Sequence, residues 1–132
     1  MQFGVPRRGL PSAASLRKWA GSVSGEILIR IVGEAEGRRL NRTFRKSDHA
    51  TNVLSFPYGH GRGDIVLCHP VIAREARAQG KALAAHYAHL VVHGLLHLRG
   101  HDHQTCAQAG RMERVEARIL RGLGFADPYR LE

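Results

Sequence analysis

The segment of residues 93–103, HGLLHLRGHDH, constrains this chain most, because a helical histidine pair is followed by a breaker and a further histidine. An α-helix advances about 100° per residue, so His93 and His97 lie on one face about one turn apart. Gly100 allows the chain to leave the helix through a left-handed or otherwise open conformation and to present His103 from the following turn. The spacing therefore predicts three imidazoles that converge on one point.

Neutral imidazoles suit zinc, and three protein ligands leave the open fourth position that catalytic zinc sites have. We therefore predict one Zn²⁺ per chain, held by His93, His97 and His103. Two histidines at this spacing can also lie on a helix surface without binding a metal, but the glycine and the third histidine favour a metal site. His101 alternates with His103 across Asp102, so an extended turn points it away from the metal, toward the surroundings of the site or the surface.

The same spacing occurs in the metzincin proteases, in which a glutamate follows the first histidine and acts as general base. Gly94 occupies that position here, and glycine cannot transfer a proton. A metallopeptidase is therefore the less favoured reading, and a hydrolase of another substrate class fits better.

The charge of the chain points to an anionic partner. Lys and Arg number 20 against 11 Asp and Glu, which gives a formal net charge of +9 with histidine neutral. Nucleic acid is favoured over a membrane surface, because the sequence has neither a long polybasic run nor a basic amphipathic anchor. No apolar run approaches the length of a membrane span and no secretory signal is visible, so we expect a cytoplasmic protein without membrane partners.

The two cysteines form no CxxC pair, and a disulfide framework is not expected. Cys68 ends an apolar run and is predicted to lie in the core. For Cys106, just past the histidine segment, a small buried residue is favoured over a fourth metal ligand.

The length of 132 residues predicts a single domain, 1–132, in which the Pro- and Gly-rich residues 1–11 form a flexible arm. Hydrophobic periodicity, caps and breakers then predict helices and strands. The expected helices are Ser12 or Ser15 to about Ala20, Glu34–Phe44, Pro70–Gln79, Lys81–Leu98 and Thr105–Arg121, and the expected strands are Glu26–Val32, Asn52–Pro57 and Asp64–Cys68. This order predicts an α+β fold, a small mixed β-sheet packed by helices, with the metal-binding helix central.

Two segments resemble the YbeY family of rRNA-maturation endoribonucleases. Residues 93–103 match the family's H-G-x-L-H-L-x-G-x-D-H, and residues 40–57, LNRTFRKSDHATNVLSFP, form the second match. The likeness runs from about Glu26 to Leu123, although Phe44 and His101 stand where tyrosine is common. It implies a zincin-like fold and one metal on the three histidines. It also implies single-strand-specific RNA cleavage in small-subunit rRNA 3′ end maturation and ribosome quality control, with ribosomal small-subunit components as partners.

The resemblance also marks Arg45 as the counterpart of the family's functionally critical arginine. A guanidinium offers a planar, two-point donor to a phosphate. Asp102, beside the last ligand, is predicted to orient a histidine or to accept a proton, and the orienting role is favoured. Asp64 is a weaker candidate, equally consistent with capping a strand turn. Further candidates for RNA contacts are Arg42, Lys46 and Arg99.

Charge and metal alone also allow a non-enzymatic RNA-binding or ribosome-assembly factor in which the metal only stabilises the fold. Metal-dependent cleavage of purified RNA would support the enzyme and argue against the non-enzymatic factor.

Overall fold

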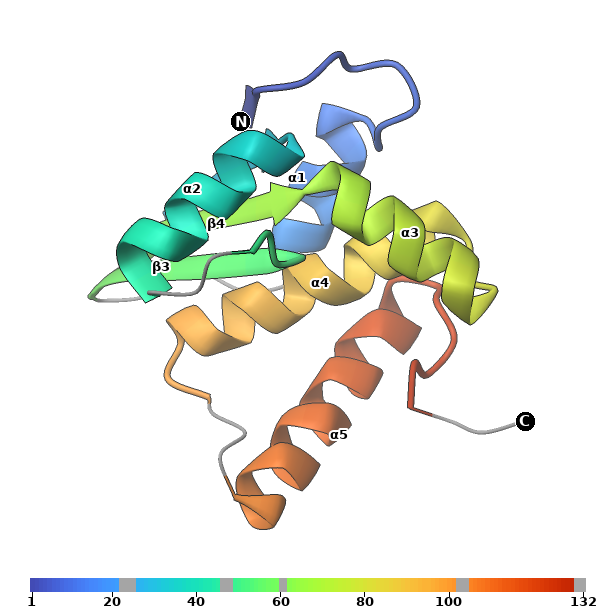
Figure 1. Ribbon diagram of the computed structural model, residues 1–132. Helices are drawn as coiled ribbons and strands as arrows, with labels where there is room; N and C mark the ends of the chain where they lie inside the picture. The colour runs from blue at the N-terminus through green and yellow to red at the C-terminus, as the bar shows by residue number, and fades with distance from the viewer. Residues whose placement is uncertain (22–25, 46–48, 60–61, 102–104, 130–132) are drawn as a thin grey trace.

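The computed structural model describes residues 1–21, 26–45, 49–59, 62–101 and 105–129, which form an α+β fold (Figure 1). Every predicted helix and strand is present, with bounds that differ by a few residues. The elements are β1 (Gln2–Phe3), α1 (Ala13–Ala20), β2 (Ile27–Val32), α2 (Glu34–Arg45), β3 (Val53–Gly59), β4 (Arg62–Cys68), α3 (His69–Gln79), α4 (Leu83–Leu98) and α5 (Cys106–Gly122).

The starts of α1 and α5 follow from local side-chain chemistry. The Ser12 hydroxyl accepts the Ser15 backbone N–H at 3.0 Å and caps α1. At α5, Thr105 and Gln108 form a reciprocal capping box, each accepting the other's backbone N–H at 3.1 Å. Such caps satisfy N–H groups that have no partner within the helix.

The strands form a mixed sheet in the order β1-β2-β4-β3. The central pair, β2 and β4, is parallel with Ile29 opposite Ile65, whereas β3 is antiparallel to β4. The predicted flexible arm needs correction at Gln2 and Phe3, which pair in parallel with β2. A two-residue strand is too short to show the alternation by which strands are recognised in a sequence.

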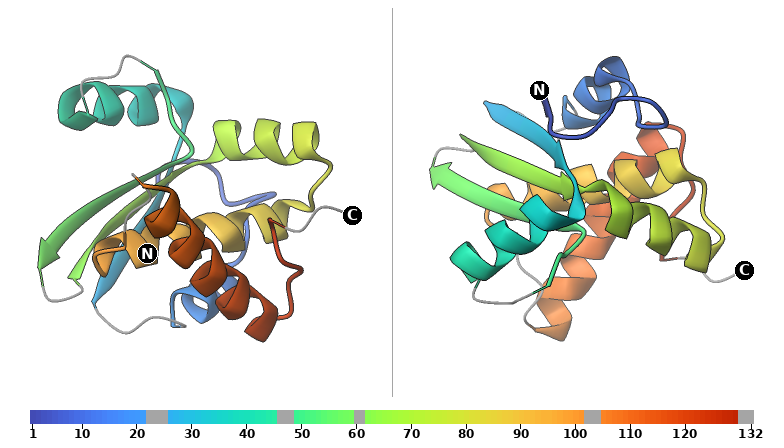
Figure 2. Two further views of the ribbon diagram at one scale, coloured as in Figure 1. Left: turned by 90° about the horizontal axis from the view of Figure 1, so that it is seen from below. Right: turned by 45° about the horizontal axis from the view of Figure 1, so that its top comes forward.

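The sheet buries both of its faces (Figure 2). On one face Ile29, Ile31, Ile65 and Leu67 join a large core with residues of α1, α4 and α5. On the other face Val66 and Cys68 join a smaller cluster, against which Leu40 of α2 packs. Alternate residues of β4 thus point to opposite cores, as the pleat requires.

Helix α4 has ten buried residues among its 16 and lies centrally against the sheet, as the sequence predicts. It contacts the sheet closely at Gly94, whose carbonyl accepts a hydrogen bond from the buried Ser55 hydroxyl at 3.2 Å. A Cβ at position 94 would lie 3.1 Å from Ser55 Oγ and 3.3 Å from two carbons of Ile65. Position 94 therefore faces the sheet, and glycine there lets the helix pack closely.

Among the helices that the structure describes, none combines the length and apolar character needed to cross a membrane.

We predict that Gly94→Ala destabilises the protein by about 1 kcal/mol in urea unfolding, because tight packing outweighs the helix-propensity gain of alanine. Gly94→Glu would bury a carboxylate against the sheet and should prevent stable folding. The control is Gly110→Ala in α5, where the nearest atom to a new Cβ is Arg114 Nη1 at 3.4 Å. That variant should gain up to about 1 kcal/mol. Stabilisation by Gly94→Ala would contradict the packing argument.

Candidate metal centre

Four histidines form a row along one face of α4. His86, His89, His93 and His97 are spaced by three or four residues, and successive ring centroids lie 6.4, 6.3 and 4.7 Å apart. Side-chain exposure increases along the row, from 5% at His86 to 14% at His89 and 24% at His93. The row therefore becomes accessible toward the C-terminal end of the helix, where the predicted ligands lie.

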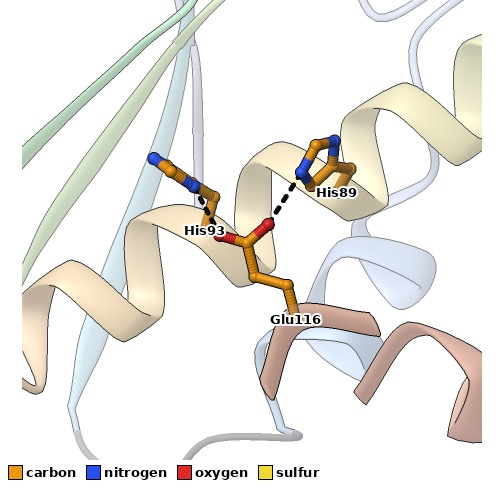
Figure 3. Close-up of side chains that lie close together, drawn as sticks. All are labelled: His89, His93 and Glu116. Carbon is orange, nitrogen blue, oxygen red and sulfur yellow. Dashed lines mark hydrogen bonds and ion pairs between the residues drawn. The ribbon is translucent and has the colours of Figure 1, made fainter. Parts of the chain in front are cut away.

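The carboxylate of Glu116 on α5 holds the middle of this row (Figure 3). Its side chain has no solvent exposure, yet Oε1 lies 2.6 Å from His93 Nδ1 and Oε2 lies 2.8 Å from His89 Nε2. The Tyr129 hydroxyl also donates to Oε2. Burial alone would raise the pKa of Glu116, but the hydrogen bonds from His89, His93 and Tyr129 outweigh it and lower the pKa to about 2.

An ionised carboxylate can only accept hydrogen bonds, so the imidazole proton of a neutral His93 lies on Nδ1. The lone pair is then on Nε2, which faces His97, and the Nε2 atoms of the two imidazoles are 3.1 Å apart. Two nitrogen ligands of one tetrahedral zinc ion, each about 2.0 Å from the metal, are separated by about 3.3 Å. His93 and His97 therefore fit a shared metal ion, with Glu116 orienting His93 from behind.

The turn after α4 takes the form that the sequence predicts at Gly100. Gly100 has φ 91°, its N–H donates to the His97 carbonyl, and the N–H of His101 donates to the Leu96 carbonyl, both at 3.0 Å. These two hydrogen bonds and the positive φ of Gly100 end the helix and turn the chain away from the helix axis. The predicted third ligand, His103, lies outside the described residues, as do Asp102 and Lys46.

The remaining predicted residues lie on several elements. Arg42 is exposed on α2, and Arg45 is the last residue of that helix, with its side chain outside the described part. Arg99 is exposed at the end of α4. Asp64 lies on β4 and accepts a hydrogen bond from the Tyr58 hydroxyl of the neighbouring strand β3. This hydrogen bond links the two strands.

Both cysteine thiols are free. Cys68 is buried, as predicted, but Cys106 is exposed, so the expectation of a buried residue was wrong there. Cys106 is the first residue of α5, and the buried residues of that helix begin only at Met112.

A second possible ligand group shares His93 with the first. Ligand atoms of His89, His93 and Glu116 all lie within 4.8 Å of one another. The sequence reasoning missed His89 and Glu116. A signal was present, since Glu116 falls within the apolar stripe of α5, next to Val115 and between Met112 and Ile119, where a carboxylate needs partners.

The fold is that of an α+β protein, and the paired imidazoles near the end of its central helix could hold a metal ion. Comparison with known proteins is more specific. The family model Endoribonuclease YbeY matches residues 8–124. The chain belongs to the YbeY endoribonuclease family.

Relatives named Endoribonuclease YbeY support this assignment. The protein of Aromatoleum aromaticum is 53% identical over 125 residues, covering 90% of this chain and 81% of the relative. That of Alkalilimnicola ehrlichii is 50% identical, covering 96% and 86%. The solution structure of TM1509 from Thermotoga maritima matches with a TM-score of 0.55 and 23% identity over 98% of each chain, and supports the fold.

We predict that Glu116→Ala lowers the free energy of unfolding of the metal-free protein by about 3 kcal/mol, because it leaves buried donors of α4 without an acceptor. Glu116→Gln keeps the side-chain volume and one acceptor oxygen, so it should lower the free energy of unfolding by less. Urea unfolding in the presence of a chelator measures both. Glu113→Ala, an exposed change on the same helix, should stay within about 0.5 kcal/mol. Equal effects at positions 113 and 116 would show that the carboxylate does not organise the row.

Proposed function

We propose that the protein is a zinc-dependent endoribonuclease that cleaves single-stranded RNA. On this proposal it acts in maturation of the small-subunit rRNA 3′ end and in ribosome quality control, in the cytoplasm, with ribosomal small-subunit components as partners. The observation that carries the proposal is the 3.1 Å approach of the His93 and His97 Nε2 atoms, with the Glu116 carboxylate bonded behind His93. Family membership and the net charge of +9 support RNA as the substrate.

We assign the zinc to His93, His97 and His103 rather than to the group that contains His89 and Glu116. Both oxygens of Glu116 already accept hydrogen bonds, and the carboxylate has no solvent exposure. A phosphate could not approach an ion held there, whereas the Nε2 pair lies at the more accessible end of the row. A catalytic metal needs such an open position.

Zinc bound at the Nε2 pair supplies Lewis acidity toward a phosphoryl oxygen and toward water. His93 and His97 hold the ion as neutral imidazoles, and Glu116 keeps the proton of His93 on Nδ1. Asp102 is assigned the corresponding orienting role at another ligand. Arg45 is assigned to the phosphate, which its planar guanidinium can bind at two points and so stabilise as negative charge develops.

Exposed aromatic rings near the end of α2 support RNA binding on that side. Phe44, the neighbour of Arg45, is 61% exposed and contacts Phe56 of β3 edge-to-face, with ring centroids 5.3 Å apart. Tyr58, farther along β3, is 67% exposed. Unpaired bases stack on such rings. In double-stranded RNA the bases are paired and are not available for this contact. Arg42, Lys46 and Arg99 are assigned to backbone contacts.

A peptidase is disfavoured by the packing of α4. The metzincin glutamate position is Gly94, and its Cβ direction leads to Ser55 and Ile65 in the sheet. The residue therefore supplies no general base, and the close packing leaves no room for one. The non-enzymatic assembly factor remains the alternative that a cleavage assay tests.

We predict that the wild-type protein binds about one zinc ion and that His93→Ala and His97→Ala abolish tight binding, because each removes one of only three protein ligands. Competition with a chromophoric chelator measures the affinity. His89→Ala removes only an outer partner and should weaken binding by at most about a hundredfold. The exposed His49→Ala is the control. Tight binding by His97→Ala, together with loss in His89→Ala, would instead assign the ion to the His89 and Glu116 group.

We predict that Arg45→Ala and Arg45→Lys each slow single-turnover RNA cleavage by about a hundredfold or more, while zinc content and melting temperature stay unchanged. Lysine keeps the charge but loses the two-point fork, so its failure separates geometry from simple attraction. Arg77→Lys on α3 is the control. Cleavage at the wild-type rate by both Arg45 variants would remove this residue from the active site. Absence of metal-dependent cleavage by the wild type would favour the assembly factor.

A further inference from the structure

Four exposed arginines form a stripe along α5. Arg111, Arg114, Arg118 and Arg121 follow one another at intervals of three, four and three residues, which places them on one helix face over a rise of about 15 Å. We call this set the α5 arginine stripe. Helix α5 runs alongside α4 on the same side of the sheet (Figures 1 and 2).

The arginines of the stripe differ from others on the surface. Arg30, Arg62 and Arg74 each form an ion pair with a glutamate, at 2.8, 3.0 and 2.9 Å. Within the part of the chain that the structure describes, none of the four arginines of the stripe forms an ion pair. Their charge is therefore available to an external anion, and each side chain presents several N–H donors.

A hollow of about 400 Å³ joins the stripe to the end of the metal-binding helix. Three arginines of the stripe line it, together with residues of the turn after α4. Its polar lining consists of Arg99, His101, Gln108, Arg111, Arg114 and Arg118. No acidic residue is among the described residues that line it, so several positive charges converge on one space. One of its lining residues, Arg99, is only two positions after His97 in the sequence.

A second hollow, of about 360 Å³, is lined by residues of α5 between Gly110 and Arg121, together with Asp127 and Tyr129. Glu113 and Asp127 are among its lining residues, and their carboxylates reduce the positive potential there. The first hollow is thus the more favourable place for an anion, and it is also the nearer to the metal ligands.

We propose that the α5 arginine stripe and Arg99 bind the sugar-phosphate backbone of RNA next to the point of cleavage. The inference deepens the proposed function and rests on it for the position of the scissile bond. A row of guanidinium groups matches an anion that repeats along a strand. An acidic protein is less suitable, because protein interfaces need an apolar centre and Val115 is the only apolar side chain lining the first hollow within the described residues.

The test compares two triple variants that each remove three positive charges. Arg111→Gln, Arg114→Gln and Arg118→Gln change the stripe, whereas Arg17→Gln, Lys18→Gln and Arg77→Gln change exposed positions on α1 and α3. Fluorescence anisotropy measures binding of a labelled single-stranded RNA over a salt series, with a chelator present and RNA integrity checked on a gel. Thermal melting confirms that both variants are folded.

We expect the stripe variant to bind RNA at least tenfold more weakly than wild type at about 100 mM salt. The slope of log affinity against log salt should become shallower by about 2, at about 0.7 per lost phosphate contact on a single strand. The control variant should stay within about threefold of wild type. Equal binding by the two variants would overturn the proposal.

Two further measurements distinguish the alternatives. If wild type binds polyglutamate as tightly as RNA, and the stripe variant loses both, the surface is a site for an acidic protein and the proposal is wrong. Steady-state cleavage of a long RNA should show a raised KM and an unchanged kcat in the stripe variant. If wild type cleaves no RNA but binding still depends on the stripe, the proposed catalysis fails while the RNA surface stands.

Discussion

An ionised carboxylate without solvent exposure persists only where donors surround it, because removing its partners leaves an uncompensated charge in a medium of low polarity. Glu116 meets this condition through His89 and His93 of α4 and Tyr129, which follows α5. One side chain therefore joins two helices and the segment beyond them. The same bonds fix which nitrogen of His93 carries the proton, so the interaction that joins α5 to α4 also orients the imidazole that we propose as a metal ligand.

Helix α4 can contribute both to the core and to the proposed metal site because its faces have separate roles. Gly94 meets Ser55 and Ile65 and brings the helix close to the sheet, while the histidine row faces α5. A helix packed this tightly has little freedom to rotate about its axis. Packing of Gly94 on a neighbouring face of the helix therefore helps to hold the histidine row in its orientation toward α5.

The features that sequence reasoning predicted correctly depend on local chemistry. The helix that carries His93 and His97, and the chain reversal at Gly100, follow from residues close together in the sequence. The role of Glu116 depends on a contact with His93 across 23 positions, and no local pattern pairs a particular carboxylate with a particular imidazole. The pairing of Gln2 and Phe3 with β2 is likewise a long-range event. The arginine spacing on α5 is visible in the sequence, but its meaning depends on the turn at Gly100, which brings Arg99 and His101 to the same hollow.

The bonds of Glu116 also set an order on the maturation of the protein itself. Chains are made from the N-terminus, so His93 is synthesised before Glu116 and Tyr129. Until those two residues are available, Nδ1 of His93 lacks its Glu116 acceptor, and the histidine face of α4 lacks its contact with α5. A partly synthesised chain can thus contain the whole HGLLHLRGHDH segment without the Glu116 bond that orients His93. The contact of α5 with α4 therefore forms only after the histidine face that it covers has been synthesised.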